Sequence, residues 1–207
     1  MKTLVGLLLS LALTGCTHVF TWGESAKPVS AAETAADQVA LILAPTGVLR
    51  VGVYRGSPTS LVQNHGVATG VAHDLGFALG QALGVPVQIV EYPRVAEVIE
   101  ALRAKKIDFT FTNASTQRAQ WLDFTPTLIR LELGLLVARN SDIQSLEQMD
   151  RLGVRVGVSQ GSSSQATLSA RLKLAVLSPQ ANLTVAQTAL AAGQLDAFAT
   201  NKAVLFE

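Results

Sequence analysis

The sequence predicts an α/β protein with two lobes, each a parallel-rich sheet flanked by helices. Short apolar runs alternate with helix-period segments, and two of these segments recur later in the chain in the same order. The 207 residues are 49% hydrophobic and 15% charged, which allows a substantial buried core and excludes a disordered chain. The formal net charge is only +1, so we expect no nucleic-acid partner.

Two internal repeats define the lobes. Residues 49–57 match residues 154–162 at six of nine positions, and residues 101–113 match residues 189–201 at six of thirteen. Both halves therefore run from a strand and a Gly/Ser loop to a helix–strand unit that ends in Thr-Asn. Chance similarity between short β-rich strings is the alternative, and two repeats in the same order disfavour it.

In the first lobe the pattern predicts three strands separated by two helices. The strands are short apolar runs of the kind that is buried on both faces of a parallel sheet. A glycine stop signal follows the first helix, and the second helix ends in basic residues, which favour the negative end of the helix dipole. In chain order we expect a strand at 51–53, a helix at 71–83, a strand at 85–90, a helix at 96–104 and a strand at 107–111.

The second lobe repeats this order, and a βαβαβ order implies right-handed crossovers. We expect a strand at 154–158, a helix from about 164, a strand near 174–177, a helix from about 185 and a strand at 195–199. A short helix over 35–44 precedes the first lobe and stops at a Pro-Thr-Gly turn.

Polar loops follow the carboxyl ends of the predicted strands, where the ligands of open α/β sheets bind. These loops span residues 54–60, 112–118, 160–164 and 200–201. Two lobes that face each other with these loops form a cleft, and we expect the binding site there.

The N-terminus has the pattern of an export signal. Lys2 precedes a mostly apolar run at 4–13, much shorter than the roughly 20 residues that span a bilayer. Leu13-Thr14-Gly15-Cys16 resembles the lipobox of bacterial lipoproteins. The resemblance implies cleavage before Cys16 and its acylation, giving a lipid anchor to a membrane in the periplasm or cell envelope. An ordinary cleaved signal with a buried thiol is the alternative.

These patterns divide the chain into four segments. Residues 17–32 are rich in Ser, Ala, Thr and Gly, which suits a tether, and the lone cysteine excludes an internal disulfide. We expect a lipoprotein signal peptide at 1–15, the lipidated cysteine with a linker and leading helix at 16–46, lobe 1 at 47–130 and an incomplete lobe 2 at 131–207.

Six segments resemble a known family in their order and spacing. They are Leu49-Arg50-Val51-Gly52-Val53, residues 70–83 with Asp74, residues 102–108, Arg118 followed by Asp123-Phe124-Thr125-Pro126, residues 140–143 and residues 154–163. The chain resembles the family 3 extracellular solute-binding proteins of ABC transporters, whose type members bind polar amino acids. The resemblance implies a type II periplasmic-binding-protein-like fold with two crossover strands and hinge closure. It also implies a monomer that binds a small-molecule solute and works with an ABC-transporter membrane permease.

The resemblance assigns an anion-binding role to three residues. Arg118 corresponds to the arginine that holds the ligand carboxylate, for which a planar guanidinium offers two parallel donors. The alternative is a surface arginine paired with Asp123. Ser162 and Ser163 fall at the start of a lobe 2 helix, where free backbone N–H groups bind anions, with simple N-capping as the alternative.

Other positions complete the expected ligand site or depart from the family. Asn201 stands where amino-acid-binding members have the aspartate that binds the ligand ammonium, and an amide cannot offset a buried cation. Tyr54 substitutes for the family's aromatic platform, and Thr112 and Asn113 lie in a strand-end turn. The family's C-terminal return to lobe 1 is missing before Glu207, so we expect weaker closure. We expect a small polar or anionic solute, amino-acid-like or a carboxylate, and a standard α-amino acid is not favoured.

Two other functions stay open. One is a cyclohexadienyl dehydratase-like enzyme on the same fold, which needs an acid in the cleft, with Glu91 and Glu132 as nearby candidates. The other is a sensor or recognition lobe of a larger envelope protein. The histidines have no metal-ligand spacing, and nucleophile and phosphate-loop motifs are missing. We therefore expect no metal, cofactor or catalytic residue, and a structural role for the repeated Asp108 and Asp196.

Overall fold

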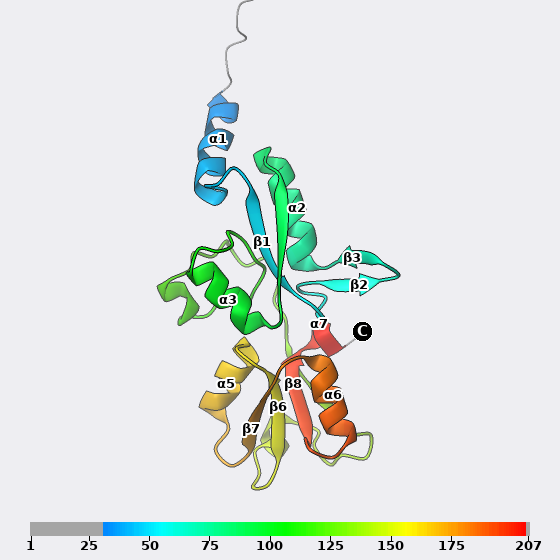
Figure 1. Ribbon diagram of the computed structural model, residues 1–207. Coiled ribbons are helices and arrows are strands. Elements are labelled where there is room, and N and C mark those ends of the chain that lie inside the picture. The colour runs from blue at the N-terminus through cyan, green and yellow to red at the C-terminus, as the bar shows by residue number, and fades with distance from the viewer. Residues whose placement is uncertain (1–30, 206–207) are drawn as a thin grey trace, which may run out of the picture.

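The computed structural model describes residues 31–205, which form two lobes stacked one above the other (Figure 1). The predicted signal peptide, Cys16 with its lipid anchor, and most of the predicted linker lie outside the described residues. No helix within residues 31–205 is both long enough and apolar enough to span a membrane.

The first lobe is built on two parallel strands with a helix on each face. Strand β1 (Leu49–Tyr54) pairs with β4 (Val87–Tyr92) in register from end to end. Helix α2 (Val71–Leu83) packs on one face of β1, and α3 (Val95–Arg103) packs on the other. Helix α1 (Ala31–Leu43) precedes β1. The predicted bounds of α2 are confirmed, and those of α3 and β4 lie within two residues of the structure.

The predicted strand at 107–111 is wrong. Only a single bridge, between Val51 and Phe109, joins this segment to β1. The Thr110 hydroxyl donates a hydrogen bond of 2.8 Å to the carbonyl of Gly52. The next N–H of a continuing parallel ladder would need that carbonyl as its acceptor. The Thr110 hydroxyl thus binds the carbonyl that a continuing ladder would use, and the ladder stops after one bridge.

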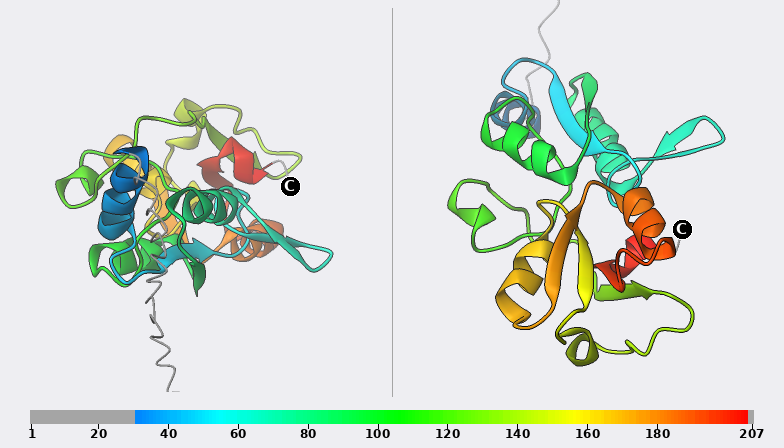
Figure 2. Two further views of the ribbon diagram at one scale, coloured as in Figure 1. Left: turned by 90° about the horizontal axis from the view of Figure 1, so that it is seen from above. Right: turned by 60° about the horizontal axis from the view of Figure 1, so that its bottom comes forward.

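A small hairpin that the sequence did not predict projects from the first lobe (Figure 2). Strands β2 (Val62–Asn64) and β3 (Val67–Thr69) are antiparallel. The two turn residues, His65 and Gly66, have φ values of 51° and 83°. Two successive residues with positive φ are typical of a type I′ turn. Strands of three residues are too short to display a periodicity, which is why the pattern missed them.

The second lobe contains one four-stranded sheet in the order β5-β8-β6-β7. The strands are β5 (Leu133–Val137), β6 (Arg155–Ser159), β7 (Val176–Gln180) and β8 (Ala197–Asn201). Strand β5 is antiparallel to β8, and the other pairs are parallel. The predicted parallel-rich sheet is confirmed, with β7 starting two residues later than expected.

Helices cover both faces of the second sheet. The remaining elements are the short α4 (Leu146–Met149), α5 (Ser163–Arg171), α6 (Leu183–Ala191), the terminal α7 (Lys202–Leu205) and the 3₁₀ helix η1 (Arg118–Gln120). Leu168 of α5 packs against Val156 and Val158 on one face. Ala186 of α6 packs against Phe198 on the other, so each face of the sheet has its own buried cluster.

The sequence repeat is also a structural repeat. In each lobe an arginine of one parallel strand, β1 or β6, binds an aspartate bidentately through Nε and Nη2, Arg50 to Asp108 and Arg155 to Asp196. The backbone N–H of the same arginine donates to the same carboxylate, at 2.9 Å in the first lobe and 2.7 Å in the second. These aspartates have a structural role: they tie β1 in the first lobe and β6 in the second to the segment that returns beside it.

Candidate functional site

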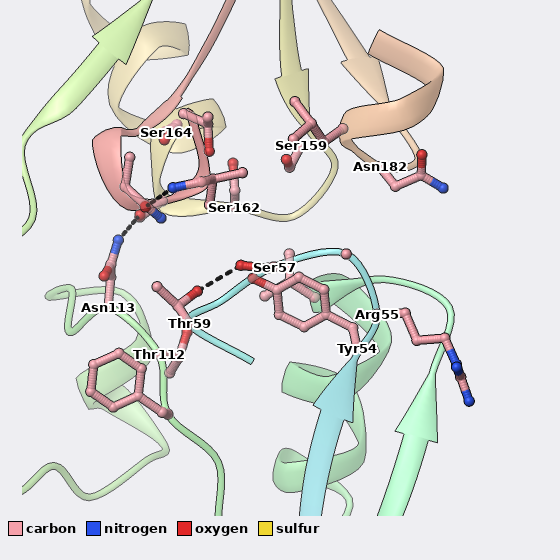
Figure 3. A pocket seen from close by; sticks show the side chains of 18 of the residues that line it. Tyr54, Arg55, Ser57, Thr59, Thr112, Asn113, Ser159, Ser162, Ser164 and Asn182 are labelled. Carbon is pink, nitrogen blue, oxygen red and sulfur yellow. Dashed lines mark hydrogen bonds between the residues drawn. The ribbon is translucent and has the colours of Figure 1, made fainter. Parts of the chain in front are cut away.

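A pocket lies between the lobes, at the carboxyl ends of the strands. It encloses about 740 Å³ of non-atom space, part of which is open solvent. Figure 3 shows side chains of both lobes pointing toward this gap. The structure brings together in it all seven residues that the sequence predicted for ligand binding: Tyr54, Thr112, Asn113, Arg118, Ser162, Ser163 and Asn201.

Arg118 is the buried cation of this pocket. It opens η1 and is only 8% exposed. Its Nη1 donates to Thr112 Oγ1 at 2.8 Å and to the carbonyl of Asn113 at 3.0 Å, and its Nη2 donates to the carbonyl of Gly161 at 2.9 Å. Burial lowers the pKa of Arg118, and the nearby Tyr54 opposes this effect. The guanidinium stays charged, because arginine is not deprotonated in proteins.

The predicted alternative, an ion pair between Arg118 and Asp123, does not form. All three partners of the Arg118 side chain are neutral oxygens, and within residues 31–205 no carboxylate lies within ion-pair distance of it. Arg50 and Arg155 each bind a carboxylate through Nε and Nη2. Arg118 instead donates to the protein from both Nη1 and Nη2, and its Nε has no hydrogen-bond partner in the described part of the chain. A buried guanidinium with a free Nε–H is able to bind an anion.

Direct contacts join the two lobes around the pocket. Asn113 Nδ2 donates to Ser163 Oγ at 2.5 Å, and Arg94 Nη1 donates to Gln160 Oε1 at 2.6 Å. Gly161 has φ +74°, and a Cβ there would lie 2.6 Å from the Cβ of Ala96 in the other lobe. Only glycine fits this approach, because it lacks a side chain and tolerates positive φ. The lobes are therefore in a closed arrangement.

Two helices of the second lobe begin at the pocket. The Ser162 hydroxyl caps α5 by accepting from the N–H of Gln165 at 3.1 Å. The Asn182 amide oxygen caps α6 by accepting from the N–H of Val185 at 2.9 Å. The N-capping interpretation of Ser162 is thus correct, and it is compatible with a ligand role, because the other first-turn N–H groups of a helix still favour anions.

The predicted ammonium end of the site has no negative charge. The Asn201 side-chain oxygen accepts from the N–H of Val204 at 3.2 Å, at the start of α7. Its amide N–H groups have no partner in the described chain. None of the described residues that line the pocket is an aspartate or glutamate, and the second arginine at its rim, Arg55, is already paired with Glu91.

The acids considered for catalysis lie elsewhere. Glu91 binds Arg55 bidentately, and Glu132 forms an ion pair with Lys202. Neither glutamate lines the pocket. Among residues 31–205 there is also no group of three or more histidine, cysteine, aspartate or glutamate side chains placed to hold a metal ion.

Six further uncharged polar residues line the pocket; all but Ser159 and Asn182 lie in the predicted strand-end loops, but none was named as a ligand residue. They are Ser57, Thr59, Ser159, Ser164, Asn182 and Thr200. The strand-end rule would have found Asn182 if the end of β7 had been placed at Gln180 rather than near 177. Thr200 repeats Thr112 in the internal echo, so the repeat itself contained a signal for it.

The chain shares sequence and fold with known binding proteins. The histidine-binding periplasmic protein of Escherichia coli K12 is 34% identical over 111 residues, which are 53% of this chain and 42% of that protein. An ancestral arginine-binding protein bound to arginine has a TM-score of 0.70 and 28% identity, covering 77% of this chain and 72% of that one. An ancestral amino acid-binding protein, a precursor of cyclohexadienyl dehydratase, has a TM-score of 0.69 and 27% identity, covering 82% and 75%.

The chain thus spans less than half the length of the curated relative that it matches. The family resemblance inferred from the sequence is nevertheless confirmed, because the model of one family matches residues 49–203, most of the chain. This chain belongs to the bacterial extracellular solute-binding proteins, family 3.

Proposed function

We propose that the protein binds a small carboxylate-bearing solute in the pocket between the lobes and delivers it to an ABC importer. The observation that carries this proposal is Arg118, a guanidinium that is 8% exposed and has no carboxylate partner in the described chain. A buried, unneutralised charge costs free energy, and an anionic ligand that enters the pocket removes that cost.

The neighbouring groups suit the same ligand. Arg118 lies beside the start of α5, because its Nη2 donates to the carbonyl of Gly161 directly before the Ser162 cap, and Ser162 and Ser163 line the same pocket. Tyr54 and Phe111 line it from the first lobe and supply apolar contact for the body of the solute. The bond from Asn113 to Ser163 crosses between the lobes and supports closure over the ligand.

The cellular part of the proposal rests on the N-terminus and on the relatives. We infer a signal peptide at 1–15, lipidation of Cys16 and attachment in the periplasm or cell envelope, with lobe 1 at 47–130 and lobe 2 from 131. A relative is named as a periplasmic histidine-binding protein. The protein acts as a monomer with a membrane permease. Mass spectrometry of the membrane fraction tests this: a diacyl or triacyl mass on a chain starting at Cys16 is expected, and an unmodified Cys16 contradicts it.

A dehydratase is the less favoured function. One structural neighbour is described as a precursor of cyclohexadienyl dehydratase. Such an elimination needs an acid beside the substrate, and Glu91 and Glu132 are both engaged outside the pocket. Turnover of prephenate or arogenate by the purified protein would revive the enzyme interpretation.

Isothermal titration with amino acids and simple organic acids tests the binding proposal. We expect at least one carboxylate to bind, and Arg118→Gln to weaken it by about 100-fold, since leaving a buried charge partner unpaired costs about 2–5 kcal/mol. Arg151→Gln is the matched control, because Arg151 pairs with Asp142 outside the pocket. Equal affinity in wild type and Arg118→Gln, or no binding of any carboxylate, would overturn the proposal.

A further inference from the structure

The charge balance of the pocket is uneven. Of the ionisable side chains that line it, Arg118 is a cation without a carboxylate, and Arg55 is neutralised by Glu91. A zwitterionic amino acid can pair its carboxylate with Arg118, but its ammonium adds a second cation, so the net positive charge of the pocket is unchanged. A ligand with net negative charge neutralises it, and the beginnings of α5 and α6 add partial positive charge at the same pocket.

The far end of the site offers hydrogen-bond donors rather than negative charge. The side-chain oxygen of Asn201 accepts a hydrogen bond from the N–H of Val204. The side-chain N–H groups of Asn201 remain available to a ligand. Ser164 is 9% exposed and Thr200 is 5% exposed, and both line the pocket. Neither hydroxyl has a hydrogen-bond partner in the described chain, and no buried side-chain oxygen there lacks one, so both hydroxyl oxygens are open to the pocket. These hydroxyls are therefore available to a polar ligand group.

We propose that the ligand is a small organic acid without an ammonium group, whose second polar end is an oxygen: a hydroxyl, an oxo group or a second carboxylate. Its first carboxylate binds Arg118, and its second end accepts from Asn201, Ser164 and Thr200. An ammonium at that end would meet the N–H groups of Asn201 and no carboxylate, so it would lose hydration without an ionic partner. The inference rests on the proposed function, because it describes the ligand of the same pocket.

Matched ligand sets separate the two claims. L-glutamate is compared with 2-oxoglutarate, 2-hydroxyglutarate and glutarate, and L-alanine with pyruvate, lactate and propionate, by isothermal titration of the full chain. In the set that binds most tightly, we expect an oxygen-only acid to bind at least 10-fold more tightly than the amino acid. An amino acid that binds equally or more tightly overturns the inference and leaves the proposed function standing. Failure of every acid and every amino acid to bind overturns both.

The substitution Asn201→Asp tests the position itself. Aspartate caps helices as well as asparagine does, so α7 keeps its cap while the pocket gains a carboxylate. We expect the amino acid to gain at least 10-fold over its oxygen analogue. Ser145→Asp is the control, since Ser145 caps α4 outside the pocket, and it leaves the preference unchanged. If Asn201→Asp melts at the same temperature as the wild type and its ligand preference is unchanged, the inference is contradicted.

Discussion

Both lobes contain the same aspartate lock, the bidentate pair Arg50–Asp108 in the first lobe and Arg155–Asp196 in the second. The segment that follows the aspartate forms a full strand in only one of them. In the second lobe, β8 lies between β6 and β5 and forms a five-residue strand. In the first lobe the equivalent segment meets only β1 within the described residues, and a single bridge forms. The register is conserved, because Val51 faces Phe109 as Val156 faces Ala197. The repeat thus specifies the lock and the register. The segment after the aspartate forms a full strand only in the second lobe, where it has a strand partner on both of its edges.

The lobes also differ at one equivalent position, residues 110 and 198. Phe198 is fully buried and packs in the cluster under α6. Thr110 is half-buried and uses its hydroxyl on the carbonyl of Gly52. One lobe therefore uses this position for apolar packing, and the other uses it for a hydrogen bond.

The largest expected loss of stability tests this difference between Phe198 and Thr110. Phe198→Ala should lower the free energy of unfolding by about 3–5 kcal/mol, because it removes a buried aromatic ring and leaves a cavity. Thr110→Val should cost only about 1 kcal/mol, the net value of one hydrogen bond. Urea denaturation followed by circular dichroism measures both. Similar losses of unfolding free energy in the two variants would mean that the two positions contribute equally to stability, against this prediction.

Removing the lock should cost more in the first lobe. The Asp108 side chain is 7% exposed, whereas that of Asp196 is 34% exposed. Asp108→Asn leaves the Arg50 guanidinium without its ionic partner, and we expect a loss of about 3 kcal/mol, the low end for a broken buried pair. Asp196→Asn should cost less, because water screens the exposed Arg155. Urea midpoints of the two variants, compared at pH 7, decide the order, and a larger loss in Asp196→Asn would reverse the comparison.

Acid should weaken the lock of the second lobe. Hydrogen bonds from the Arg155 side chain hold the pKa of Asp196 below its ordinary value, against a smaller opposing effect of burial. The folded state thus binds this proton more weakly than the unfolded state does. The resulting stability is fully present above the ordinary aspartate pKa of about 4 and is lost as the pH falls through the lower folded-state pKa. The difference in unfolding free energy between wild type and Asp196→Asn should shrink over that interval, and a constant difference would refute this.

The smallest expected effect concerns equivalent helix ends. Lys105 and Gly193 each follow a helix, and both residues have a positive φ, 56° and 65°. A side chain in this conformation costs about 1–2 kcal/mol, which glycine avoids at some entropic cost. Lys105→Gly should therefore raise the free energy of unfolding by up to about 1 kcal/mol, and Gly193→Lys should lower it by about 1 kcal/mol. No atom lies within 4 Å of a Cβ at Gly193, so this cost is confined to the backbone. Thermal melts that move in the same direction for both variants would exclude this explanation.

Much of the fold was predictable because its signals are local. Apolar runs and glycine stops located α2, β6 and β8, and the repeat located both aspartates. The strand at 107–111 was mispredicted, since its pairing depends on a Thr110 side chain that reaches a neighbouring strand. The β2–β3 hairpin was missed because its strands are shorter than any periodicity.

For the pocket, the sequence by itself determined which loops meet and which residue types they bring, because strand ends of a parallel sheet share one edge. Only the tertiary structure decided how those residues are used. It showed that Arg118 binds neutral oxygens with Nη1 and Nη2, that the Asn201 oxygen caps α7, and that the hydroxyls of Ser164 and Thr200 have no hydrogen-bond partner in the described chain. Burial and hydrogen-bond partners depend on residues far apart in the chain, so no local pattern encodes them.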